Sequence, residues 1–241
     1  MISIVIPIYN PENLSFKNEK FLRPQLESLI KYTGLSRYIE IILIVNGYTS
    51  ETVFTITNIT DCYNKAFKIW YFKEPLGYTK AANEGMKRAK GDFIILLNDD
   101  VILLNQLKNY WVSRLLEPFV FDIKMGITGC HKLRCHVTNE DFIVGYCMCV
   151  KKEVIDKIGY YDEIFSPGYL EDTDYCLRAK KEGFLIQEVG GQFKNEENRA
   201  IGTFPLFHYG GLSFKNVPNT LERKIRNEQI LLDKKLKGFY S

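Results

Sequence analysis

The stretch Gly91-Asp92-Phe93-Ile94-Ile95-Leu96-Leu97-Asn98-Asp99-Asp100 decides the fold that the sequence predicts. Five consecutive apolar residues are typical of a strand buried on both faces, in a parallel sheet with helices above and below. In open α/β sheets, ligands bind just beyond the carboxyl ends of the strands, where Asn98, Asp99 and Asp100 would lie. Two adjacent carboxylates there suit a divalent cation that also binds phosphate. Taken alone, the same three residues could instead be a polar turn that caps the next helix.

Strands and helices alternate along the chain before this stretch. Short apolar runs predict strands and amphipathic segments predict helices, whereas residues 51–63 are ambiguous because β-branched side chains disfavour a helix. The order β-α-β-(α)-β-α-β is typical of a parallel sheet with right-handed crossovers. The predicted strands are 3–7, 39–45, 69–72 and 93–97, and the predicted helices are 19–32 and 79–90.

The common glycine-rich nucleotide-binding motifs are absent. No GxGxxG follows the first predicted strand, and no GxxxxGK[ST] occurs in the sequence. A dinucleotide-binding Rossmann domain and a P-loop NTPase therefore lose their main support.

The second half of the chain mixes shorter elements and ends in a basic amphipathic helix. We find no internal repeat or linker, so we expect a single domain over residues 1–241. Within it, residues 1–103 would form one half, residues 104–218 a second, and residues 219–241 a C-terminal helix. The predicted strands are 125–130, 142–150, 185–189 and 204–208, and the predicted helices are 104–116, 152–158, 168–183 and 219–236.

Composition excludes several classes. A net charge of +3 is too small to indicate a nucleic-acid partner. No apolar run approaches the roughly 20 residues needed to span a bilayer, and the N-terminus lacks the basic region of a signal peptide. We therefore expect a cytoplasmic protein whose six cysteines are reduced thiols rather than a disulfide framework. The cysteine spacings are not those of a usual zinc site.

The chain resembles the inverting glycosyltransferases of family 2, which have the GT-A fold, and within them the rhamnosyl- and galactofuranosyl-transferase-like members. The resemblance implies an α/β fold with a Rossmann-like, mostly parallel nucleotide-binding sheet flanked by helices, and a smaller mixed sheet on the acceptor side. Residues 1–103 would bind the sugar nucleotide and residues 104–218 the acceptor. The matching segments occur in the family's order and are 5–10, 45–47, 76–77, 83–85, 97–100, 145–150, 158–163, 171–174, 177–178 and 208–211.

By this resemblance, Asn98-Asp99-Asp100 is a variant of the family's DxD motif. Asp100 would be the direct ligand of Mn²⁺ or Mg²⁺, and His208 matches a position where related enzymes place a further ligand. Imidazole suits Mn²⁺ better than Mg²⁺. The alternative for His208 is an ordinary hydrogen-bonded histidine at a strand end.

The resemblance also assigns the catalytic acids. An inverting transfer needs one general base to take the proton of the acceptor hydroxyl. Asp172 matches that base, and Glu171 beside it would hold the acceptor or exchange roles with Asp172. Alternatively, the acids at 171, 172 and 174 only favour the N-terminus of a helix.

Further matches predict the residues that bind the nucleotide sugar. We expect them at the ends of the first, second and fourth predicted strands and on the helix over 79–90. Val45 stands where family members commonly carry an acid that recognises the base, so the choice between a UDP- and a dTDP-sugar stays open. The predicted nucleotide-sugar residues are Pro7, Tyr9, Asn10, Asn46, Lys80, Asn83, Asn98 and Asp99.

The expected function is metal-dependent, inverting transfer of a sugar from a nucleoside diphosphate sugar to a hydroxyl of a glycan or lipid-linked saccharide. The alternative is a catalytically silent binding or scaffold module with the same fold, which Asn98 and Val45 favour. A nucleotidyltransferase is disfavoured because Tyr9-Asn10-Pro11-Glu12 replaces a glycine-rich loop. The C-terminal helix could rest on the inner face of an anionic membrane, although its apolar side could equally pack on the domain.

Overall fold

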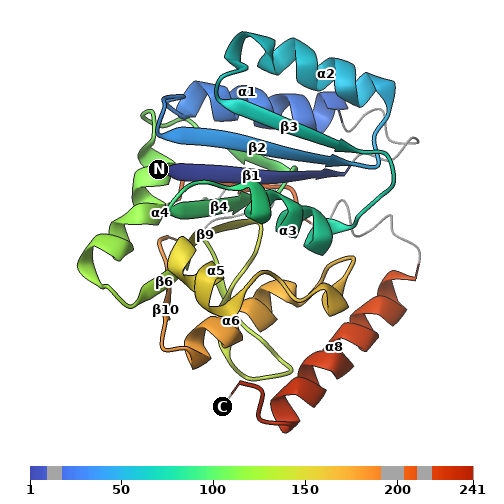
Figure 1. Cartoon of the computed structure of the whole chain (residues 1–241), viewed down its shortest axis with the longest axis vertical. Coiled ribbons are helices and arrows are strands. Elements are labelled where there is room, and N and C mark those ends of the chain that lie inside the picture. Colours follow the sequence, from blue (N-terminus) through green and yellow to red (C-terminus); the bar gives the residue numbers. More distant parts are fainter. Residues whose placement is uncertain (10–17, 191–203, 211–218, 241) are drawn as a thin grey trace.

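A central seven-stranded sheet organises the molecule in the order β10-β6-β9-β4-β1-β2-β3. The computed structural model describes residues 1–9, 18–190, 204–210 and 219–240, and Figure 1 shows the arrangement. All neighbouring pairs are parallel except those of β9, which runs antiparallel between β4 and β6. The strands are β1 (Ile2–Tyr9), β2 (Ile39–Asn46), β3 (Phe67–Phe72), β4 (Phe93–Leu97), β6 (Met125–Gly129), β9 (Cys147–Lys151) and β10 (Leu185–Glu188).

Helices cover both faces of this sheet, which is why its central strands β1, β2, β4 and β9 are mostly apolar and buried. Side chains alternate between the faces along a strand, so Ile4 and Ile6 of β1 join one core cluster while Val5 joins the other. The first cluster is covered by α1 (Arg23–Tyr32), α2 (Ser50–Thr60) and α4 (Tyr110–Phe121). The second is covered by α3 (Tyr78–Arg88), α5 (Lys152–Ile158), α6 (Glu171–Lys181) and α8 (Thr220–Leu236).

The structure confirms the predicted alternation of strands and helices and resolves its ambiguous part. Residues 51–63 contain α2, which begins after Thr49, whose side chain accepts a hydrogen bond from the Thr52 amide. Beyond α2, a 3-10 turn covers Asp61–Tyr63. A short π-helical turn, Asn18–Leu22, leads into α1. The N-cap explains why a segment with low helix propensity is helical.

The first strand continues past Pro7, where the sequence predicted its end. β1 pairs with β4 only as far as Val5, whereas it pairs with β2 through Tyr9. Beyond Val5 one edge of β1 is therefore open, and a residue without an N–H is tolerated there. The two extra residues carry β1 to the level of Asn46, the last residue of β2.

The expected smaller sheet takes the form of two antiparallel pairs. β5 (Val101–Leu103) pairs with β11 (Leu206–His208), and β7 (Lys132–Arg134) pairs with β8 (Asp141–Ile143). The first pair places His208 opposite Val101, beside Asp100. Neither β5 nor β7 was predicted, because each has only three residues.

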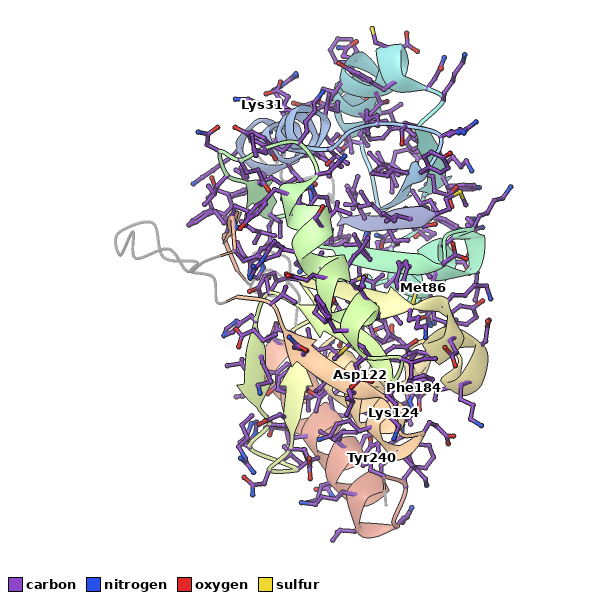
Figure 2. All side chains as sticks on the ribbon, turned by 90° about the vertical axis from the view of Figure 1, so that its left-hand side faces the viewer. Lys31, Met86, Asp122, Lys124, Phe184 and Tyr240 are labelled. Atoms are coloured by element: carbon purple, nitrogen blue, oxygen red, sulfur yellow. The ribbon has the colours of Figure 1, made fainter. Side chains whose placement is uncertain are left out.

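Two segments between β5 and β9 differ from their predictions. The helix expected over 104–116 begins at Tyr110, after Asn109 in the left-handed region (φ 65°), and continues through Pro118 to Phe121. Figure 2 shows α4 crossing in front of the sheet, with Asp122 and Lys124 labelled at its lower end. The strand expected over 142–150 is two strands, β8 and β9, because residues 144–146 leave the ladder.

The C-terminal helix α8 packs through part of its surface and exposes the rest. Leu231 is fully buried, but Leu221, Ile225 and Leu236 are 71%, 58% and 75% exposed. The apolar side of this helix is therefore only partly covered by the described part of the chain. Within the same described ranges, no helix is long and apolar enough to cross a membrane.

Candidate functional site

A cavity of about 790 Å³ opens beyond the carboxyl ends of the first strands. It is the place where α/β sheets bind ligands. Five further parts of the chain complete its wall, and they are residues 75–78, residues 144–146, residues within 166–172, His208, and residues 223–224 of α8. Among the predicted site residues, those that line it are Pro7, Tyr9, Asn46, Asn98, Asp99, Asp100, Glu171, Asp172 and His208.

The strand ends are held together by side chains that also line the cavity. Asp99 Oδ2 accepts a hydrogen bond from the Tyr9 amide at 3.0 Å, which joins the end of β1 to the residues after β4. Asn46 donates from Nδ2 to the carbonyl of Ile8 at 2.8 Å and accepts at Oδ1 from the Leu76 amide at 3.0 Å. Its amide therefore fixes the shape of this wall.

Val45 takes no part in the cavity wall. Its side chain is fully buried in the core cluster beneath α1 and α2. The position that carries a base-recognising acid in many relatives of the expected family is thus a packing position in this chain.

The structure does not bring Lys80 and Asn83 to the cavity wall. Lys80 is exposed on α3. Asn83 is buried, and its amide is engaged with the backbone of Tyr161, donating to its carbonyl and accepting from its N–H, both at 3.0 Å. The N-terminal end of α3 contributes Gly77 and Tyr78 to the wall instead. Asn10 lies outside the described residues.

Asp100 and His208 form a buried pair on the cavity wall. His208 Nε2 lies 3.1 Å from Asp100 Oδ1, and the imidazole stacks on the ring of Tyr146 with centroids 4.0 Å apart. Despite this proximity, Asp100 Oδ1 and both His208 nitrogens lack a hydrogen-bond partner within the described structure. Buried polar atoms are nearly always satisfied, and an ion is one common explanation for an exception.

This pair fits a divalent cation. A carboxylate oxygen and an imidazole nitrogen are ligands for Mn²⁺, and carboxylate and water oxygens suit Mg²⁺. The described residues contain no group of three or more His, Cys, Asp or Glu side chains that could hold a metal. A cation bound by Asp100 and His208 would therefore take its remaining ligands from water or from a bound phosphate.

Glu171 and Asp172 also line the cavity, at the start of α6, where Glu171 is buried and Asp172 is partly buried. Asp172 Oδ2 accepts a hydrogen bond from the Gly145 amide at 2.9 Å, and its Oδ1 accepts one from the Thr173 amide at 2.7 Å. Glu171 Oε2, by contrast, has no partner among the described atoms. Glu171 thus keeps a free acceptor next to the cavity.

Burial and mutual repulsion change the protonation of these two acids. Burial raises the pKa of Glu171 most, and the neighbouring Asp172 carboxylate raises it further. Burial also raises the pKa of Asp172, although the amides of Gly145 and Thr173 oppose this by bonding to its ionised form. Because Asp172 has these donors, the pair favours an ionised Asp172 beside a protonated Glu171.

The segment before the acids adopts an unusual backbone that α8 supports. Tyr169 and Leu170 have φ of 84° and 71°, a region that residues with side chains rarely occupy. Asn227 of α8 is fully buried, and its Nδ2 donates to the carbonyls of Phe165, Gly168 and Tyr169 at 2.9–3.0 Å.

Sequence analysis missed several residues of this wall. Tyr146 lies in a segment matched to the expected family, but nothing in its spacing indicates that it stacks on a histidine 62 positions later. The contribution of α8, including Arg223 and Lys224, was also missed. Their side chains reach the cavity through a long-range packing that no local pattern encodes.

Comparison with known proteins identifies the family. Residues 3–158 match the family model described as glycosyl transferase family 2. An uncharacterised glycosyltransferase of Haemophilus influenzae is 32% identical over 105 residues, which are 44% of this chain and 38% of that protein. The chain thus spans well under half the length of this relative.

Solved structures show the same GT-A fold. A mannosyltransferase from Pyrobaculum calidifontis, in complex with GDP-Man and Mn²⁺, has a TM-score of 0.61 at 14% identity, over 78% of this chain and 54% of that one. GalNAc-T7 with UDP, GalNAc and Mn²⁺ has a TM-score of 0.64 at 16% identity, over 78% and 42% of the two chains.

Proposed function

This chain belongs to glycosyl transferase family 2, and we propose that it transfers a sugar, with inversion, from a nucleoside diphosphate sugar to a hydroxyl of a glycan or lipid-linked saccharide. One observation carries the proposal. One cavity brings together the strand ends near Tyr9 and Asp99, the Asp100–His208 pair with its unsatisfied buried atoms, and the acids Glu171 and Asp172. These are the parts that donor binding, leaving-group stabilisation and proton removal require.

The donor would lie along the strand ends. Tyr9 and Asp99 would contact the base and ribose, with Asn46 and Pro7 shaping the wall beneath them. Since Val45 is buried in the core, base selection falls to these neighbours. The mannosyltransferase and GalNAc-T7 structures contain GDP-Man and UDP respectively; for this chain we propose a UDP- or dTDP-sugar.

Asp100 and His208 would hold Mn²⁺ or Mg²⁺ against the diphosphate. The bound ion would supply neutralisation of the charge that develops on the leaving group. Asn98 Oδ1 is buried and without a partner within the described ranges, so it offers one more oxygen toward the ribose or the ion's waters.

Asp172 would act as the general base. The acceptor oxygen forms a bond to the anomeric carbon while the bond from that carbon to the phosphate oxygen breaks, and the nucleoside diphosphate leaves. The hydroxyl proton passes to Asp172, whose orientation is set by the amides of Gly145 and Thr173. Attack on the face opposite the leaving group inverts the anomeric configuration.

Glu171 would position the acceptor. Its raised pKa favours the protonated acid, which can donate a hydrogen bond as well as accept one at the unpartnered Oε2. A neutral Glu171 also avoids a second negative charge beside the ionised Asp172.

A thermal-shift screen tests the donor site first. UDP, dTDP and GDP would each be added with Mn²⁺, Mg²⁺ or EDTA, because a ligand of the native state raises the melting temperature. We expect a metal-dependent shift with UDP or dTDP. NMR of the product formed from an α-linked donor would then reveal a β-linkage. No shift with any nucleotide would overturn the proposal, and a shift without turnover would favour the catalytically silent module.

A further inference from the structure

Two cations from the C-terminal helix line the same cavity as the acids. Arg223 and Lys224 lie close to the N-terminal end of α8, which begins at Thr220, and are partly buried on the cavity wall. α8 lies beyond residues 3–158, the segment that matches the family model. Residues 223 and 224 also lie outside every segment that carries the resemblance to the family in the sequence, unlike Glu171, Asp172 and His208.

Neither cation is neutralised by a carboxylate within the described structure. Lys224 Nζ lies 5.3 Å from the centroid of the Tyr169 ring, a cation–π contact that leaves its N–H donors available. The backbone amide of Arg223 donates to the carbonyl of Asn219, but no hydrogen bond or ion pair joins the Arg223 guanidinium to another described residue. Lys234, on the same helix, differs because it bonds to Asp162 and Asp174, both at 2.7 Å. Arg223 and Lys224 can thus receive an anion without first breaking an ion pair.

Their attachments place the two cations on the side of the acids. Lys224 contacts Tyr169, which precedes Glu171 by two residues, and Asn227 one turn further along α8 bonds to the same segment. In Figure 1, α8 lies on the far side of α6 from β1, β2 and β3, with its N-terminal end toward the side to which those strands point. The contacts of α8 are therefore with the acid-bearing segment rather than with the strand ends.

We infer that the acceptor carries a phosphate group close to the hydroxyl that receives the sugar, and that Arg223 and Lys224 bind it. The inference rests on the proposed function, because it needs Glu171 and Asp172 to mark the acceptor end of the cavity. Arg presents a planar fork that suits phosphate oxygens, and Lys adds a point charge. The unpartnered Glu171 Oε2 would take a neighbouring hydroxyl of the same acceptor.

Recognition of the acceptor phosphate by α8 would keep it apart from the donor diphosphate, which binds in the same cavity. The donor diphosphate would be held by a cation on Asp100 and His208, whereas the acceptor phosphate would be held by protein cations on α8. A sugar phosphate and a lipid-linked sugar diphosphate share this chemistry. A neutral glycan would leave Arg223 without a partner.

The test measures binding in the intact protein and does not depend on turnover. Wild type is compared with the double variant Arg223→Gln/Lys224→Gln, and Lys237→Gln, an exposed lysine past the end of α8, is the matched control. Calorimetry at low salt, with UDP and Mn²⁺ present, uses glucose 1-phosphate, methyl glucoside and farnesyl diphosphate as probes. UDP affinity is measured separately for each protein.

We expect wild type and the control to bind glucose 1-phosphate at least tenfold more tightly than methyl glucoside, and the double variant to lose that preference while its UDP affinity is unchanged. Tighter binding of farnesyl diphosphate than of glucose 1-phosphate would support a lipid-linked source, and the reverse a soluble one. The inference would be overturned if the double variant lost as much affinity for UDP as for glucose 1-phosphate. It would also be overturned if the double variant still preferred glucose 1-phosphate to methyl glucoside. Failure of wild type to bind UDP, dTDP or GDP would instead overturn the proposed function.

Discussion

The backbone N–H of Gly145 donates a hydrogen bond to Oδ2 of Asp172 at 2.9 Å. The two residues come from different elements, since Gly145 lies between β8 and β9 and Asp172 lies in the first turn of α6. A Cβ at position 145 would lie 3.4 Å from the Cβ of Asp172. That separation is an ordinary van der Waals contact, so the backbone N–H at position 145, rather than the absence of a side chain there, orients the carboxylate.

Replacing Asp172 with Asn should remove turnover but retain donor binding. Asn has nearly the same shape but cannot accept the acceptor proton, and general-base catalysis contributes about 10²- to 10⁴-fold. We expect a loss of kcat in that range, measured by nucleotide release, with an unchanged thermal shift by UDP and Mn²⁺. Asp156→Asn, at an exposed site on α5, is the control. If the Asp172→Asn variant kept full activity, another residue would have to be the general base.

As the pH decreases, activity should be lost at a higher pH than it would be with an ordinary carboxylate base. Burial raises the pKa of Asp172, so protonation begins above the usual value of about 4. The base works only when ionised, and activity is therefore present above the raised pKa and lost as the pH drops through it. The pH profile of kcat/KM, with melting temperature recorded at each pH, checks this. An acidic limb centred at or below pH 4 would contradict it.

Removal of the metal or of His208 should weaken nucleotide binding together with catalysis. We expect EDTA to abolish the thermal shift by UDP, and His208→Ala to raise the Mn²⁺ concentration needed for half-maximal activity at least tenfold. His208 would be a direct ligand, and losing one of two protein ligands costs affinity. His136→Ala, an exposed histidine, should behave like wild type. Metal-independent binding in wild type would exclude the proposed role.

Asn227→Leu should lower stability and activity, although residue 227 lies on α8. The change removes the side-chain donor from the carbonyls of Gly168 and Tyr169, whereas the carbonyl of Phe165 keeps the Gly168 amide as a donor at 2.9 Å. Unsatisfied buried groups cost about 1–3 kcal/mol each, so we expect the free energy of unfolding to fall by about 2–4 kcal/mol. Denaturant melts and kcat are the measurements. Gln229→Ala, exposed on the same helix, should change stability by less than about 0.5 kcal/mol.

Weak binding to anionic vesicles is expected from the exposed apolar residues of α8. Leu221, Ile225 and Leu236 remain largely exposed on a helix that also carries basic side chains. Co-sedimentation with vesicles containing phosphatidylserine would compare wild type with Leu221→Ser/Ile225→Ser. We expect less pelleting of the variant. Equal pelleting of both proteins would rule out the membrane contact, which the sequence analysis left as one of two alternatives for this helix.

The central sheet was predictable because its signals are local. Each buried strand is a short apolar run, and residues 93–97 are followed at once by the polar residues that line the cavity. Asp100, Asp172 and His208 were also predicted as site residues, and the structure brings all three to one cavity. Their proposed chemical roles are predictions that the experiments above address.

Other features depend on contacts that have no local pattern. Lys80 and Asn83 are three residues apart on α3, yet one side chain is exposed and the other is bonded to Tyr161. Which side of α3 faces the cavity is decided by its packing on β1 and β2. The stacking of Tyr146 on His208 likewise depends on the pairing of β11 with β5, a three-residue strand that the sequence did not predict.

The end of α8 controls residues far from it in sequence. Lys234 and Tyr240 both donate to Asp174, which lies two residues after Asp172. Proteolytic cleavage within α8 would leave the central sheet and its strand ends intact. It would separate Lys234 and Tyr240 from the first part of the helix, and so weaken the contacts that hold the acid-bearing segment in place. On the proposed function, the cleaved protein is expected to bind a sugar nucleotide without transferring its sugar.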